Sequence, residues 1–134
     1  MSVPDARWPD AKAPSLDQFE SIAATALADL PEHFRKMCRG VLIRVADFPD
    51  DEIAREMEIE SPFELLGLFT VPETGRMPNS IFLYRRPILD YWAEHDETLG
   101  AVITHVLVHE IGHHFGLSDA DMEAIEAAAD EARG

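Results

Sequence analysis

The spacing of hydrophobic residues along the chain changes repeatedly between a helical and a strand-like pattern. Hydrophobic positions three and four residues apart are typical of helices that bury one face, whereas short β-branched and aromatic runs are typical of strands. The pattern predicts helices at residues 15–30, 31–37, 50–57, 87–94, 97–115 and after 119, and strands at 41–46, 67–71 and 80–84. The expected fold is therefore α+β, with a small sheet packed against the long helix.

Local signals add detail to several of these elements. Ser15 and Gln18 have the spacing of a capping box, in which each side chain bonds the other residue's backbone N–H. Asp96 is the expected N-cap of the long helix. The strand at 41–46 is expected to be mostly buried, and Trp92 is expected to face inward from its short helix.

Length and composition indicate a single domain. The chain has 134 residues, which is within the usual size of one hydrophobic core. Residues 1–14 contain three prolines among polar and small residues, so we expect them to form an irregular N-terminal arm. The domain is then expected to span residues 15–134.

The charge of the chain argues against some classes of partner. The formal net charge is −15 at pH 7, whereas nucleic acids and anionic membrane surfaces attract Lys and Arg. No apolar stretch approaches the roughly 20 residues of a membrane span, and residues 1–14 lack the apolar run of a signal peptide. Cys38 is the single cysteine, so an internal disulfide is impossible. We therefore expect a cytoplasmic protein without nucleic-acid or membrane partners.

Three side chains that can bind a metal ion or transfer a proton lie within one five-residue span of the long predicted helix. His109 and His113 are four residues apart, so both imidazoles lie on one helical face and can reach a single metal ion. Glu110 follows His109 directly and can accept a proton from a water molecule bound to that ion. The spacing His-Glu-x-x-His therefore indicates a metalloprotease.

Two residues beyond the helix extend this pattern. Gly116 tolerates the positive φ with which a helix can end, and the turn that follows is expected to bring Asp119 back to the metal. His109, His113 and Asp119 would then hold the ion and leave a fourth position for water. The full pattern, His-Glu-x-x-His-x-x-Gly-x-x-Asp, is far more specific than its five-residue core.

Two other histidines near the motif are weaker candidates for the metal. His105 continues the four-residue spacing, but a rise of 1.5 Å per residue separates it from His113 by about 12 Å. One ion cannot bridge that distance, so a structural role is expected for His105. His114 is expected to pack against its neighbours or to face solvent.

The carboxylate ligand has alternatives on the last predicted helix. Glu123 and Glu126 lie on that helix and would follow the second motif histidine by only ten and thirteen residues. Asp119 is favoured over both, because the turn at Gly116 delivers it directly to the site.

The motif and the residues before it resemble a known superfamily. The pattern His-Glu-x-x-His-x-x-Gly-x-x-Asp, together with Ser-Ile-Phe-Leu-Tyr-Arg-Arg-Pro at residues 80–87, resembles the zincins and, among them, the small bacterial mini-zincin metallopeptidases. The resemblance begins at about Val41. It implies a minimal zincin-like fold, in which a small mixed sheet packs on the active-site helix and further helices flank it. It also implies that the strand at 80–84 is the sheet edge that binds substrate backbone, unless this strand has no free edge.

The predicted function is zinc-dependent hydrolysis of peptide bonds in peptides or unstructured proteins. Zn²⁺ would lower the pKa of its water and polarise the scissile carbonyl, and Glu110 would act as general base. Two imidazoles and one carboxylate favour one Zn²⁺ ion, although the same ligands also accept Fe²⁺, Co²⁺ or Mn²⁺. The alternative is a metal-binding zincin-like scaffold with little or no catalysis that binds a protein or peptide.

Overall fold

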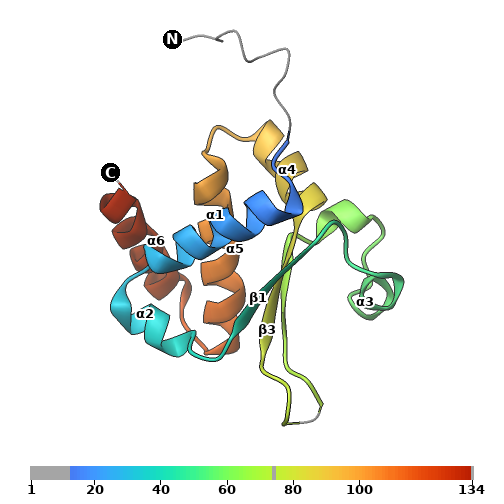
Figure 1. Cartoon of the computed structure of the whole chain (residues 1–134), viewed down its shortest axis with the longest axis horizontal. Coiled ribbons are helices and arrows are strands. Elements are labelled where there is room, and N and C mark those ends of the chain that lie inside the picture. Colours follow the sequence, from blue (N-terminus) through green and yellow to red (C-terminus); the bar gives the residue numbers. More distant parts are fainter. Residues whose placement is uncertain (1–12, 74, 134) are drawn as a thin grey trace, which may run out of the picture.

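The structure, a computed structural model, describes residues 13–73 and 75–133 (Figure 1). Residues 1–12, most of the predicted irregular arm, lie outside the described residues. The elements, in chain order, are α1 (Leu16–Ala28), α2 (Glu32–Met37), β1 (Leu42–Ala46), α3 (Asp51–Glu56), the short 3₁₀ helix η2 (Pro62–Glu64), β2 (Gly67–Thr70), β3 (Ser80–Tyr84), α4 (Arg85–Glu94), α5 (Leu99–His114) and α6 (Asp119–Arg133). Each predicted helix and strand has a counterpart among them, which confirms the α+β prediction.

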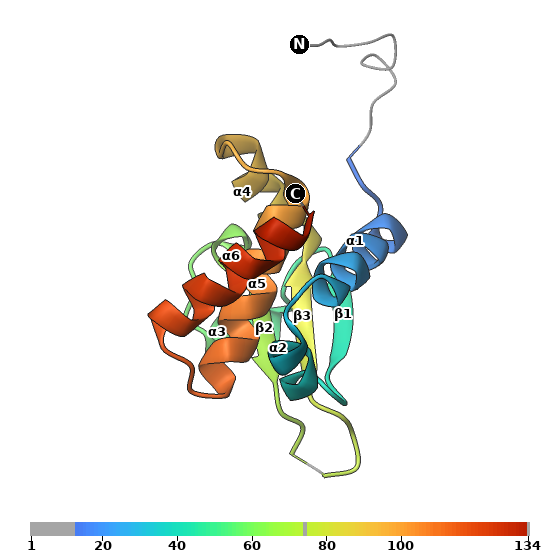
Figure 2. The same ribbon diagram turned by 90° about the vertical axis from the view of Figure 1, so that its left-hand side faces the viewer.

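The three strands form one mixed sheet in the order β1-β3-β2. β1 runs parallel to β3, with Leu42 opposite Ser80, whereas β2 runs antiparallel to it, with Gly67 opposite Leu83. A parallel pair needs a long connection, and here that connection contains α3, η2 and β2. β3 is therefore the central strand of the sheet, and Figure 2 shows it between β1 and β2.

The prediction that the strand at 80–84 forms the substrate-binding edge is wrong. β3 has a partner strand on each side over nearly its whole length, so its backbone groups are used within the sheet. Its side chains suit this central place, because Ile81 and Leu83 are both fully buried. The edge beside the active-site helix is instead β2, which pairs with no strand other than β3 among the described residues and packs against α5.

The caps of α1 and α5 test two of the predicted helix starts. The capping box is confirmed, because Gln18 N–H donates to Ser15 Oγ (3.2 Å) and Ser15 N–H donates to Gln18 Oε1 (2.8 Å). The predicted N-cap at Asp96 is wrong. Thr98 caps α5 instead, since its Oγ1 accepts from Ala101 N–H at 3.1 Å. The helix therefore begins with an ordinary side-chain cap, but the capping residue lies two positions later in the chain than predicted.

Two burial predictions are wrong because they concern the margins of the fold. β1 is an edge strand and only partly covered, so Leu42 is 44% exposed. In α4, Ile88 is fully buried but Trp92 is 37% exposed. This helix begins at Arg85, two residues before the predicted start, and tolerates Pro87 because the N–H groups of a first turn have no helical partner.

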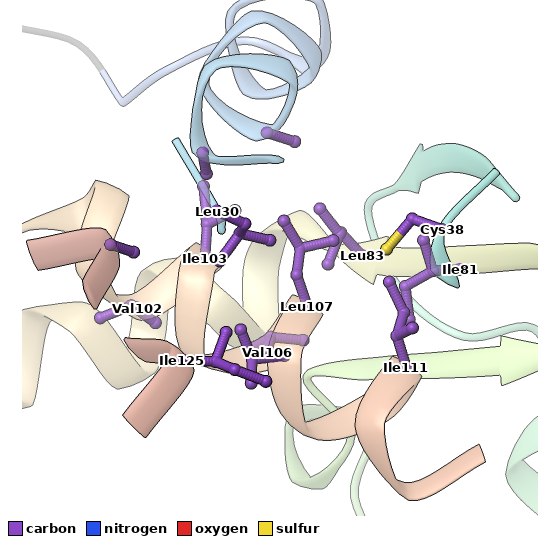
Figure 3. Packing of buried hydrophobic residues seen from close by; sticks show 14 of the residues in the cluster. Leu30, Cys38, Ile81, Leu83, Val102, Ile103, Val106, Leu107, Ile111 and Ile125 are labelled. Atoms are coloured by element: carbon purple, nitrogen blue, oxygen red, sulfur yellow. The ribbon is translucent and has the colours of Figure 1, made fainter. Parts of the chain in front are cut away.

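The core lies between the sheet and the helices that cover one of its faces. α1 contacts β1 and α5, while α5 contacts β2 and β3 and is itself covered by α6. Figure 3 shows side chains of α5 packed against those of β3 and α6. Each fully buried Leu, Ile or Val stabilises the fold by about 1.5–3 kcal/mol. Neither α5 nor any other helix of the described chain has the length and composition to cross a membrane.

The turn between α5 and α6 fixes how these two helices pack. Gly116 has φ +77°, its N–H donates to His113 O (3.1 Å), and Leu117 N–H donates to Gly112 O (2.9 Å). These two bonds form a Schellman motif, in which a left-handed residue ends the helix, so the predicted stop at Gly116 is confirmed. The chain then reverses, and α6 packs so closely that a Cβ on Gly112 would lie 2.7 Å from Met122 Sδ.

A second close approach, at Gly67, joins β2 to α5 and leads to a prediction. A Cβ on Gly67 would lie 2.6 Å from Val106 Cγ1 and 2.9 Å from the carbonyl oxygen of Phe82. The backbone oxygen cannot rotate away, so Gly67→Ala should lower the free energy of unfolding by about 1–3 kcal/mol in urea denaturation. Gly100→Ala is the matched control, because among the described residues no atom beyond its chain neighbours and its own helix backbone lies within 4 Å of that Cβ. Ala is also favoured over Gly in a helix. Equal stability of wild type and Gly67→Ala would contradict the packing described here.

Candidate active site and metal centre

The motif residues lie in the C-terminal half of α5. His109 and His113 are one turn apart, with ring centroids 5.8 Å apart and ring planes at 89°. The side chain of His109 is 25% exposed, and His113 is exposed. The two imidazoles thus lie on an accessible side of a helix whose other sides are largely buried.

Glu110 lies between α5 and the edge strand β2. Its Cγ is 3.8 Å from where a Cβ on Gly67 would stand, and its carboxylate accepts a hydrogen bond from the backbone of Phe69. Burial raises the pKa of Glu110, while the Phe69 hydrogen bond and the nearby His113 and His109 lower it by a smaller amount. A carboxylate whose pKa is raised in this way is a better proton acceptor than an exposed one.

The bond from Phe69 comes from the free edge of the sheet. Tyr84 N–H donates to Leu66 O (2.9 Å), and in an antiparallel pair such bonded residues alternate with residues whose N–H and C=O groups point away from the partner. Gly67 and Phe69 therefore direct their backbone groups toward the edge. The Glu110 carboxylate binds one of these outward N–H groups, which fixes it beside the edge.

His114 contacts β2 rather than the motif histidines. Its ring stacks on that of Phe69 at a centroid distance of 4.1 Å and an angle of 23°. Phe115 packs edge-on against both rings. The expectation that His114 packs against its neighbours is confirmed, and this aromatic contact helps to hold β2 against the end of α5.

The structure brings a carboxylate of α6 to the first motif histidine. One oxygen of Glu126 lies 3.0 Å from His109 Nε2, and the other lies 2.8 Å from His105 Nδ1. The ligand atoms of these three side chains are all within 4.8 Å of one another. Two imidazole nitrogens and a carboxylate oxygen form a donor set that fits Zn²⁺.

Asp119 lies elsewhere. It is the first residue of α6 and is exposed, next to Ser118, whose hydroxyl accepts from Asp121 N–H. Among the described residues, no cluster of three potential ligands within 4.8 Å of one another includes Asp119 or His113. The assignment of Asp119 as a metal ligand stays a prediction.

Sequence spacing alone gave little weight to Glu126 and His105. Glu126 follows the buried Ile125 and so lies at the margin of the face that α6 turns toward α5. That placement is visible in the hydrophobic pattern. What the pattern does not contain is the register between the two helices, which decides that Glu126 lies beside His109.

Comparison with known proteins finds one matching family model. A family model described as zincin-like metallopeptidase matches residues 38–129, which is more than half of the chain and contains the whole motif. The match begins close to Val41, where the resemblance seen in the sequence begins. A search of curated proteins found no match to the chain.

The raised pKa of Glu110 leads to a prediction for the metal-free protein. A carboxyl whose pKa is higher in the folded state opposes folding more and more as pH rises from its unfolded pKa, about 4.3, through its folded pKa. Glu110→Gln removes this penalty and can still accept the Phe69 hydrogen bond. In the presence of a chelator, the variant should therefore melt a few degrees higher than wild type at pH 7, with the difference shrinking toward pH 4.

Thermal unfolding followed by circular dichroism across this pH range measures the effect. Glu123→Gln, at an exposed site on α6, is the matched control and should leave the melting temperature unchanged. A Glu110→Gln variant that melts below wild type at pH 7 would show that burial of the carboxylate does not raise its pKa.

Proposed function

The chain belongs to the zincin-like metallopeptidase family, and from this membership and the site geometry we propose that it hydrolyses peptide bonds with the help of one Zn²⁺ ion. The observation that carries the proposal is the location of Glu110, which is partly buried between the motif histidines and the free edge of the sheet. A carboxylate held there is next to both the metal ligands and the surface that an extended peptide would meet.

The chain's own residues supply binding, orientation and proton transfer. His109 and His113 provide nitrogen ligands, and a carboxylate completes the set. When bound, Zn²⁺ acts as a Lewis acid that makes water a stronger nucleophile at neutral pH and polarises the scissile carbonyl. Glu110 takes the proton of the attacking water on a carboxylate oxygen and passes it to the nitrogen of the bond that breaks.

The edge of β2 is the proposed binding surface for the substrate. Gly67 and Phe69 direct backbone groups away from β3, toward the side on which Glu110 lies. An extended peptide that pairs with this edge gains main-chain hydrogen bonds whatever its sequence. The proposed substrates are therefore peptides or unstructured segments of proteins, which can adopt a strand without first unfolding.

Metal content tests the first part of the proposal. Wild type incubated with zinc and then desalted should retain about one ion per chain, as determined by elemental analysis. His113→Ala should retain much less at the same protein concentration, because it removes a nitrogen ligand. His33→Ala is the matched control, since His33 is exposed on α2, far along the chain from the motif. Wild type without bound zinc after this treatment would refute the metal site.

Peptidase activity tests the second part. With equal zinc content, Glu110→Gln should cleave an unstructured polypeptide or a short-peptide library about 10²–10⁴-fold more slowly than wild type, because the proton acceptor is lost while the shape is kept. Cleavage products are measured by mass spectrometry. If zinc-loaded wild type and the variant are equally inactive across broad substrates yet bind the same partner, the chain is a zincin-like scaffold and the enzymatic proposal fails.

A further inference from the structure

Glu126 of α6 contacts His109 at Nε2. This atom is one of the two ring nitrogens through which a histidine can bind a metal ion. Glu126 Oε2 lies 3.0 Å from His109 Nε2, so an ion bound by this nitrogen has the Glu126 carboxylate next to it. The side chain of Glu126 is 22% exposed and its second oxygen is already held by His105. The carboxylate is therefore fixed at both oxygens.

Ring geometry separates the roles of the three histidines along α5. Two imidazoles that share a tetrahedral ion at 2.0–2.1 Å have their ring centres about 5 Å apart. The His109 and His113 centroids, 5.8 Å apart and nearly perpendicular, are close to this arrangement. The His105 and His109 rings are 4.0 Å apart and tilted by 34°, as expected of two rings that lie against each other. His105 thus suits a role as hydrogen-bond partner better than as a ligand beside His109.

The register of the two helices places Glu126, and not Asp119, level with His109. α6 packs on α5 with Met122 beside Gly112, and the sharp turn makes the helices antiparallel (Figure 2). Four residues along α6, or about 6 Å, bring Glu126 level with His109. Asp119 is three residues in the other direction, about 4.5 Å past Gly112 toward the end of α5.

The contacts of the Glu126 carboxylate add to this difference. Its two oxygens lie 3.0 Å from His109 Nε2 and 2.8 Å from His105 Nδ1, so the carboxylate is directed at the first motif histidine and at its neighbour one turn earlier. Asp119 is exposed and belongs to no such cluster of ligand atoms among the described residues.

We propose that Glu126 is the carboxylate ligand of the metal ion and that His105 is a positioning residue, which holds Glu126 through its Nδ1. The proposal rests on the proposed function only in that an ion binds at His109 and His113. Hydrogen bonds from a second residue to a ligating carboxylate orient it and typically contribute 10–100-fold to metal affinity. Glu126 thus takes the ligand role that sequence spacing gives to Asp119.

Zinc affinity, measured without substrate by competition with a chromogenic chelator, tests this assignment. Glu126→Gln should bind zinc about 100-fold or more weakly than wild type, because its neutral amide is a poor ligand of the same shape. Asp119→Asn and the exposed-site control Glu123→Gln should stay within about threefold of wild type. If Asp119→Asn loses zinc and Glu126→Gln does not, the assignment is overturned.

Two further measurements separate ligation from a structural effect. The visible absorption of the Co²⁺-loaded protein reports the ligands directly and should change in Glu126→Gln but not in Asp119→Asn. An unchanged spectrum in Glu126→Gln overturns the proposal even if affinity falls. Circular dichroism of the metal-free variants shows whether each is folded before titration.

His105 is tested by a pair of variants. His105→Ala should weaken zinc binding about 10–100-fold, whereas His105→Asn should recover most of it, because the Asn amide nitrogen stands close to where Nδ1 does. If His105→Ala loses zinc as completely as His109→Ala while His113→Ala retains it, the ion is bound by His105, His109 and Glu126 alone. That result would overturn the positioning role. Because none of these readouts needs turnover, an inactive enzyme would refute the proposed function without refuting this ligand assignment.

Discussion

The close packing of α5 against β2 on one side and α6 on the other is the constraint on which the site depends. Both contacts occur at glycines, Gly67 facing Val106 and Gly112 facing Met122, where any added Cβ would collide with its neighbour. The first contact brings the sheet edge to Glu110, and the second brings Glu126 to His109. A wider spacing on either side would leave the motif histidines on an exposed helix without base or carboxylate partners.

The electrostatics of this narrow space favour a cation. Glu110 is partly desolvated, which raises its pKa, and the carboxylate of Glu126 lies on the other side of His109. The C-terminal half of α5 also carries the negative end of the helix dipole. The chain as a whole is acidic, with a net charge of −15. Among the described contacts of the site, no Lys or Arg of α5 or α6 neutralises the negative charge of these carboxylates. A bound divalent ion would stabilise both carboxylates at once, so metal binding and the ionised state of Glu110 should support each other.

The fold could be predicted largely because its elements follow local rules. The capping box at Ser15 and the helix stop at Gly116 are set by neighbouring residues, and both were predicted correctly. The strand order was not predictable in the same way, since pairing joins residues far apart in the chain. The expected substrate edge at 80–84 was wrong for this reason. The hydrophobic content of β3 fits a strand paired on both sides, as its fully buried Ile81 and Leu83 show.

The metal site shows the same limit more sharply. His109, Glu110 and His113 are close in sequence, so helical geometry alone predicts their common location. The carboxylate ligand comes from a different element, and sequence distance from His113 is a poor guide to it because the chain reverses at Gly116. After a reversal, residues farther along the second helix lie nearer to the start of the first. The separation of only thirteen residues between His113 and Glu126, which counted against Glu126 as a ligand, is what an antiparallel pair of helices needs to return to the level of His109. A residue of α6 that precedes the register contact at Gly112 and Met122 lies toward the end of α5, away from the level of His109. The length of the turn therefore selects which carboxylate of α6 reaches that histidine.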